Sequence, residues 1–113
     1  MPKVLICDDS AFMRKIFSDA IEKDSELEVH DTAYNGKNAL RKLKKLDVDL
    51  LMLDVEMPKL NGLETLKIVK DKYPDIPVIM VSALDNKETV LKALELGAFD
   101  FIPKPSGSIS LSI

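Results

Sequence analysis

Apolar runs of strand length recur along this chain, and each ends at a charged or hydroxyl side chain. The runs cover residues 4–7, 50–53, 78–81 and 99–103, and the polar side chains that end them are Asp8, Asp9, Asp54, Ser82 and Lys104. In an open parallel α/β sheet, ligands bind outside the carboxyl ends of the strands. A single Asp after a strand is usually the polar start of a loop, but five such side chains in strand order predict one shared site.

The side-chain types indicate the chemistry of that site. Three carboxylates within about 4 to 6 Å repel one another by roughly 1 to 4 kcal/mol per pair, and a divalent cation reverses that cost. Oxygen ligands without a Cys or His cluster favour Mg²⁺ or Mn²⁺ over zinc. Asp54 is placed to attack a phosphorus centre, with Lys104 neutralising charge and Ser82 donating to a phosphoryl oxygen. The pattern therefore predicts a phosphoryl site that uses Mg²⁺.

Segments with helical spacing of apolar residues separate these runs, at residues 13–21, 39–46, 63–69 and 90–94. Alternating strands and helices predict an α/β fold with a mostly parallel sheet and right-handed crossovers. Residues 27–33 alternate apolar and polar side chains, so we expect this strand at an edge of the sheet.

Small and polar residues mark the predicted helix ends. Gly36 and Gly62 precede the second and third helices, and Asp85 or Asn86 could cap the fourth. Gly97 follows the last apolar position of the fourth helix and suits a left-handed cap.

Composition limits the partners and the compartment. The 113 residues fit one domain, and 16 Lys+Arg against 19 Asp+Glu give a net charge of −3 without a long block of either sign, which disfavours nucleic acid and membrane surfaces. No apolar span of membrane length and no signal-type start is present. The lone Cys7 fits a buried, inert thiol, and the single His30 fits a surface position. Together these features predict a cytoplasmic protein.

The same polar residues lie in motifs that resemble the receiver domain of two-component response regulators. The motifs are the Asp8-Asp9 pair, Asp54 in the run DVEMPKLNG at 54–62, Ser82-Ala83, and Lys104-Pro105, and the likeness covers residues 3–105. It implies a flavodoxin-like, doubly wound sheet of five parallel strands in the order 2-1-3-4-5.

The resemblance also implies a role for each residue. Asp54 would be the phosphoacceptor, and Asp8 and Asp9 would hold Mg²⁺ with the backbone carbonyl of Glu56. Ser82 and Lys104 would bind the phosphoryl group, which the small Ala83 would leave room to enter. Phe101 is placed as the switch aromatic that turns inward when Ser82 moves, although a core position explains it equally well. The family further suggests a cis Lys104-Pro105 bond and a domain that catalyses its own phosphorylation and dephosphorylation.

Residues 9–14 (DSAFMR) and 100–110 (DFIPKPSGSIS) look like the receiver of chemotaxis protein-glutamate methylesterases. That likeness implies a chemotaxis sensor histidine kinase as phosphodonor and a C-terminal methylesterase as effector. This chain has no Gly-x-Ser-x-Gly nucleophile turn. We therefore expect a receiver domain at residues 1–105, and the start of a linker to an absent effector at 106–113.

The family's fifth helix also has no sequence here, so the chain looks like a fragment. A sheet face without that helix predicts either self-association, with residues 109–113 exchanged between copies, or folding of Ile109, Leu111 and Ile113 over that face.

Three other functions remain open. One is a stand-alone, single-domain response regulator. The second is a Mg²⁺-dependent phosphatase with an Asp nucleophile, in which an acid two residues later is expected, and Glu56 has that spacing. The third is an interaction module that keeps the fold but takes no phosphoryl group.

Overall fold

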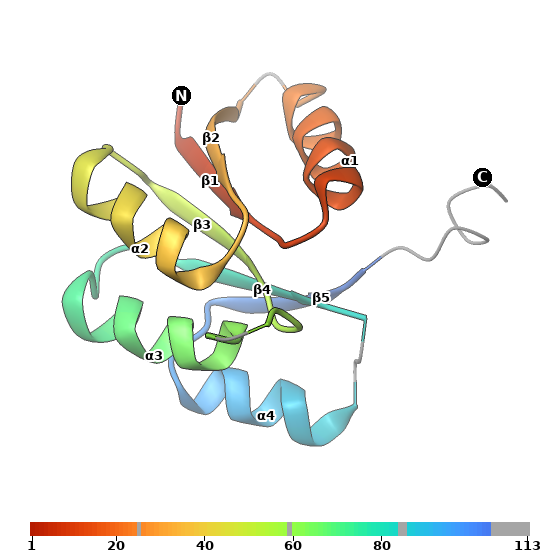
Figure 1. The fold of residues 1–113 in the computed structure, drawn as a ribbon, viewed down its shortest axis with the longest axis vertical. Helices are drawn as coiled ribbons and strands as arrows, with labels where there is room; N and C mark the ends of the chain where they lie inside the picture. The colour runs from red at the N-terminus through yellow and green to blue at the C-terminus, as the bar shows by residue number, and fades with distance from the viewer. Residues whose placement is uncertain (25, 59, 84–85, 105–113) are drawn as a thin grey trace, which may run out of the picture.

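The computed structural model describes residues 1–104 except positions 25, 59 and 84–85. Strands and helices alternate along the chain (Figure 1). In order, the elements are β1 (Lys3–Cys7), α1 (Ala11–Glu22), β2 (Glu28–Ala33), α2 (Gly36–Lys45), β3 (Leu50–Asp54), α3 (Gly62–Lys72), β4 (Val78–Ser82), α4 (Lys87–Glu95) and β5 (Asp100–Pro103). Within these described residues, no helix is long and apolar enough to cross a bilayer.

The five strands form one parallel sheet in the order β2-β1-β3-β4-β5. This order confirms the flavodoxin-like topology and places β2 at an edge, as the alternation in residues 27–33 predicted. The central strands β1 and β3 are apolar along most of their length, as is typical of strands covered on both faces, and β4 is likewise apolar. Because the strands are parallel, the carboxyl ends of all five lie along the same side of the sheet, which is called the carboxyl edge below.

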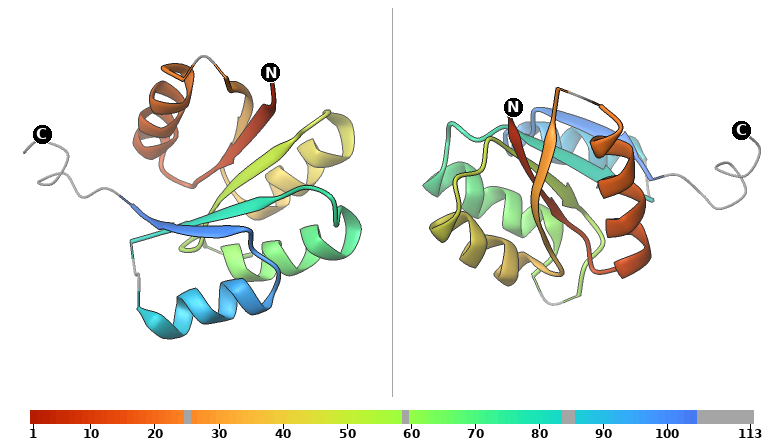
Figure 2. Two further views of the ribbon diagram at one scale, coloured as in Figure 1. Left: turned by 180° about the vertical axis from the view of Figure 1, so that it is seen from behind. Right: turned by 90° about the horizontal axis from the view of Figure 1, so that it is seen from above.

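The two faces of the sheet are covered unequally, as the views of Figure 2 show. Helices α2, α3 and α4 cover one face, where fourteen buried residues form the larger core cluster. Of the helices in the described part of the chain, α1 is the one that covers the other face, with five buried residues in its cluster. Beyond α1, on the β4 and β5 part of that face, Ile79 is half-buried and Ile102 is 37% exposed. The predictions for residues 105–113, and for the Lys104-Pro105 bond, lie outside the described residues.

Helix starts differ by one position from the sequence prediction. Gly36 and Gly62 are the first helical residues rather than residues before the helix, because Asn35 and Asn61 occupy the N-cap positions and their side chains accept backbone N–H bonds. Asn86, one of the two predicted alternatives, caps α4. Gly97 has φ of 103°, as the left-handed cap requires.

Candidate functional site

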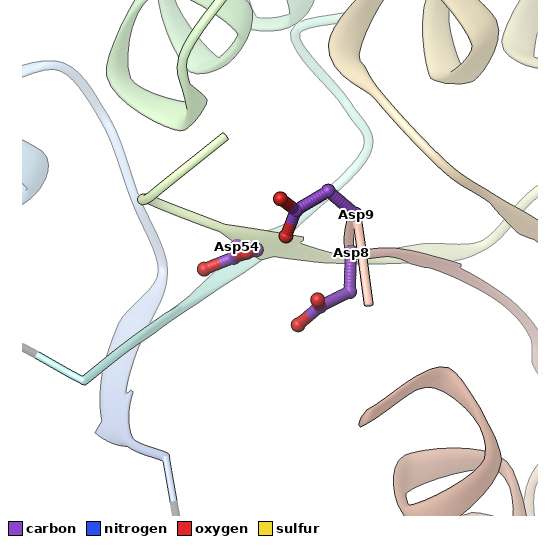
Figure 3. Close-up of side chains that lie close together, drawn as sticks. All are labelled: Asp8, Asp9 and Asp54. Atoms are coloured by element: carbon purple, nitrogen blue, oxygen red, sulfur yellow. The ribbon is translucent and has the colours of Figure 1, made fainter. Parts of the chain in front are cut away.

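Three carboxylates meet at the carboxyl edge of the sheet, as Figure 3 shows. Asp8 and Asp9 follow β1, and Asp54 is the last residue of the adjacent strand β3. One oxygen from each side chain lies within 4.8 Å of the others. Asp8 and Asp54 are each only 1% exposed, whereas Asp9 is open to solvent. The cluster thus has a buried base and an open side.

Lys104 lies across the two buried carboxylates. Its Nζ is 3.2 Å from Asp8 Oδ2 and 3.1 Å from Asp54 Oδ2. Both of these oxygens are buried and neither has a hydrogen-bond partner among the described residues, so the ammonium holds them as an ion pair. One cation facing two buried carboxylates leaves an excess of negative charge. Buried oxygens with unused acceptor capacity, all of them hard ligands, fit a Mg²⁺ ion.

The same crowding changes proton affinities. Burial, and then the neighbouring Asp8 carboxylate, raise the pKa of Asp54 to about 7, against the opposing effect of Lys104. Burial by itself would lower the pKa of Lys104, but the Asp54 and Asp8 carboxylates outweigh it and hold that pKa above its ordinary value. The charged form of Asp54 is therefore less favourable here than the charged form of a carboxylate in water.

Ser82 and Ala83 are engaged by the side chain of Glu56. The Ser82 hydroxyl donates a short hydrogen bond to Glu56 Oε2, and the Ala83 N–H donates to Glu56 Oε1 at 2.8 Å. The backbone N–H of Glu56 in turn donates to Asp54 Oδ1 at 3.1 Å. Glu56 thus connects the end of β3 to the end of β4.

Backbone packing fixes the loop that carries these groups. Val55 N–H donates to Val81 O at 2.9 Å, and Gly62 N–H donates to Val55 O at 2.9 Å. A Cβ at Gly62 would lie 2.0 Å from the carbonyl oxygen of Asp54, so only glycine allows α3 to start this close to the end of β3.

Three contributions were missed by the sequence analysis. Arg14 Nη1 donates to the backbone carbonyl of Asp8 at 2.8 Å, and Ser10 N–H donates to Asp8 Oδ1 at 2.9 Å. The Glu56 carboxylate was assigned no role at Ser82 and Ala83. Arg14 stands in the quoted DSAFMR motif, but its contact depends on where α1 packs, which residue spacing does not reveal.

The other predicted residues occupy the following positions. Phe101 is half-buried and packs against the core beneath α2, α3 and α4. Cys7 is buried, and burial, with the Asp54 and Asp8 charges, raises its pKa to about 12, which agrees with an inert thiol. His30 is exposed on edge strand β2, as expected.

Comparison with known proteins gives a consistent set of relatives. Residues 4–112 match the response regulator receiver domain family. The protein-glutamate methylesterase/protein-glutamine glutaminase of Pyrococcus abyssi is 52% identical over 113 residues, which are 98% of this chain and 30% of that protein. The chain therefore spans less than a third of the length of this curated relative.

Solved structures agree in fold and in sequence. The response regulator domain of Thermotoga maritima CheB has a TM-score of 0.89 and 44% identity, covering 99% of this chain and 84% of that one. A chain of the CheX-CheY-BeF3-Mg²⁺ complex of Borrelia burgdorferi has a TM-score of 0.85 and 34% identity, covering 98% and 84%. With its strand order and the family match over residues 4–112, the chain belongs to the response regulator receiver domain family and is similar to the receivers of chemotaxis methylesterases.

Proposed function

We propose that this chain is a phosphorylation-dependent signalling receiver in which Asp54 accepts a phosphoryl group. The observation that carries the proposal is the pair of buried carboxylates, Asp8 and Asp54, held by the single Lys104 ammonium at the open edge of the sheet. Core carboxylates that serve only stability are usually fully hydrogen-bonded, whereas these two have oxygens without such a bond among the described residues.

The proposed reaction transfers a phosphoryl group from a donor atom to a carboxylate oxygen. A carboxylate oxygen of Asp54 attacks the phosphorus of the donor, the bond from phosphorus to the donor atom breaks, and its electron pair leaves with the donor. Lys104 and the Ser82 hydroxyl offset the negative charge on the phosphoryl oxygens. Asp8, Asp9, Asp54 and the Glu56 backbone carbonyl would hold Mg²⁺, which when bound supplies further positive charge for phosphoryl oxygens.

The cofactor assignment has support from the fit of the site and from a relative. Three carboxylates with one opposing ammonium leave room for more positive charge. The similar chain from Borrelia burgdorferi belongs to a complex that contains BeF3 and Mg²⁺. A trifluoroberyllate group resembles a phosphoryl group in charge and shape, which agrees with a phosphoryl site in this fold.

The partners follow from the relatives. A histidine kinase of a chemotaxis system would donate the phosphoryl group in the cytoplasm, and a C-terminal methylesterase domain would respond to it in a longer protein. The support is the 52% identity to a protein-glutamate methylesterase/protein-glutamine glutaminase of which this chain matches 30%. A stand-alone regulator is the other arrangement, and the same site chemistry would serve both.

The conformational response would run from the phosphoryl group to β5. Ser82 ends β4, and β4 pairs with β5, on which Phe101 lies. Movement of Ser82 toward a phosphoryl group would open space for the half-buried Phe101 ring. Core packing alone also accounts for the Phe101 position, so the switch role rests on the receiver resemblance.

The phosphatase alternative requires Glu56 as a general acid two residues after the nucleophile. The Glu56 carboxylate instead accepts from the Ser82 hydroxyl and the Ala83 N–H, and both Asp8 and Asp9 would lack a function in that enzyme. These contacts favour the receiver.

One experiment separates the alternatives. The chain is incubated with a small phosphodonor and Mg²⁺, and its mass is followed with time. We expect an increment of one phosphoryl group that lasts long enough to measure and is absent in Asp54→Asn. Equal labelling of Asp54→Asn would show that Asp54 is not the acceptor. Rapid donor turnover without accumulation would support the phosphatase, and an unchanged mass would support the interaction module. Asp75→Asn, at an exposed position, is the matched control and should label normally.

A further inference from the structure

The hydrogen bonds of Glu56 place an anion on two donors at the end of β4, and one of them, the Ser82 hydroxyl, is the donor proposed above for the phosphoryl group. Its two carboxylate oxygens accept separately, one from the Ser82 hydroxyl and the other from the Ala83 N–H. These two donors therefore point toward one small anion. A carboxylate and a phosphoryl group offer the same kind of acceptor, a pair of charged oxygens about 2.2 to 2.5 Å apart, and hydrogen bonds to charged acceptors are roughly twice as strong as neutral ones.

We propose that the Glu56 side chain is an internal occupant of the phosphoryl cradle, which must leave Ser82 and Ala83 before a group on Asp54 can use them. The proposal rests on the receiver function proposed above and adds a residue that sets how readily the site is filled. The Glu56 carboxylate and a phosphoryl group cannot share the Ser82 and Ala83 donors. Each donor hydrogen makes one strong bond, and two anions held against the same donors repel each other.

The surrounding structure allows that exchange at low cost. The Glu56 backbone is held by its N–H bond to Asp54 Oδ1, and the flanking residue Val55 is fixed to Val81 on β4. Only the side chain has to move. Glu56 is half-buried, so its side chain is already partly exposed, and water would replace the two hydrogen bonds once it leaves Ser82 and Ala83. The backbone of Glu56 is thus fixed, while its side chain can move toward solvent.

The resting contact has its own test, which needs no phosphodonor. In ¹H–¹⁵N spectra of the ligand-free chain, Glu56→Ala should move the Ala83 amide proton upfield by several tenths of a ppm, because that N–H loses a charged acceptor. Glu95→Ala removes a carboxylate from an exposed position on α4 and should leave the Ala83 peak in place. An unmoved Ala83 peak in Glu56→Ala would overturn the proposal even if the chain labels on Asp54.

The competition is tested with beryllofluoride and Mg²⁺, titrated against the wild type and three Glu56 variants. Glu56→Ala removes the carboxylate that competes for both donors and should bind beryllofluoride about tenfold more tightly than the wild type, as displacement of a doubly bonded carboxylate predicts. Glu56→Asp keeps the charge but is one methylene too short, so it should bind nearly as tightly as Glu56→Ala. Glu56→Gln keeps the reach with one acceptor oxygen and should lie between Glu56→Ala and the wild type.

Each other pattern contradicts the proposal in a recognisable way. Equal affinity of the wild type and Glu56→Ala would show that nothing competes for the cradle. An Asp variant that matches the wild type, with a Gln variant that matches Glu56→Ala, would assign the effect to charge alone. Failure of every variant to bind beryllofluoride, together with failure of the wild type to label, would reject the receiver function itself, and the proposal with it.

Discussion

Leu53 and Asp54 are neighbours on strand β3 and are almost equally buried, at 0% and 1% exposure, but burial has opposite effects on them. Leu53 belongs to the larger core cluster, where removal from water stabilises the fold. Asp54 faces Asp8 at the end of the sheet, where burial disfavours the charge that the proposed chemistry needs. Burial within β3 therefore stabilises the domain at Leu53 and destabilises it at Asp54, the last residue of the strand.

This difference explains how the site is built. Apolar packing on both faces of β1 and β3 holds the two strands side by side. The carboxylates at the ends of these strands, Asp8 and Asp54, therefore lie close together. Lys104, which follows the edge strand β5, offsets part of the repulsion between Asp8 and Asp54, but its one ammonium is shared by both carboxylates. The remaining unfavourable charge is what a bound metal ion would relieve.

The largest expected effect breaks the apolar half of the comparison. Leu53→Ala should lower the free energy of unfolding by about 3 to 5 kcal/mol, because it removes buried methyl groups and leaves a cavity in a packed core. Urea denaturation followed by circular dichroism measures it. Leu94→Ala is the control, since Leu94 is 46% exposed on α4 and its loss should cost less than about 1 kcal/mol. A loss at Leu53 no larger than at Leu94 would mean that the centre of the sheet is not packed as described.

The sequence was sufficient to place the polar half of the comparison. Asp8, Asp9, Asp54, Ser82 and Lys104 follow apolar runs, and parallel strands bring their carboxyl ends to one edge, so their convergence follows from topology. The edge position of β2 was likewise readable from the hydrophobic pattern, whereas the strand order was implied by the resemblance to receiver domains.

The remaining features depend on tertiary packing. The Glu56 carboxylate could have pointed to solvent or toward Asp54, and its place on Ser82 and Ala83 is a choice of side-chain conformation that spacing does not specify. The need for glycine at position 62 arises because α3 starts against the carbonyl of Asp54, a distance that no local pattern encodes. The helix starts were displaced by one residue because Asn35 and Asn61 outcompete the glycines as caps.

A second prediction removes the unfavourable charge without removing volume. In Mg²⁺-free buffer at pH 8, Asp54→Asn should raise the free energy of unfolding by roughly 2 to 4 kcal/mol, the value of two to three pKa units. The sign follows from the raised pKa of about 7. The protonated Asp54 suits the folded state, so this stabilisation is fully present below about pH 4 and is lost as the pH rises through about 7.

Urea midpoints at several pH values test this account. The advantage of Asp54→Asn over the wild type should shrink from pH 8 to pH 5. A difference that does not change with pH, or a less stable variant, would contradict a buried and unfavourable carboxylate. Asp75→Asn, at an exposed site, should show neither gain nor pH dependence.

The smallest expected effect tests whether a cation compensates for the crowded carboxylates. Mg²⁺ that binds only the folded chain should raise the free energy of unfolding by about 1.4 kcal/mol when its concentration is ten times the dissociation constant. At lower Mg²⁺ concentrations the gain in the free energy of unfolding should be smaller. Asp9→Ala should reduce this gain sharply, because it removes one hard ligand while the exposed position leaves the core intact. Thermal unfolding across a Mg²⁺ titration measures both, with Asp24→Ala, at another exposed carboxylate, expected to behave as the wild type. An Asp9→Ala chain that gains as much as the wild type would exclude Asp9 from the metal site, and a wild type that gains nothing would leave Lys104 as the principal compensation for the buried charge.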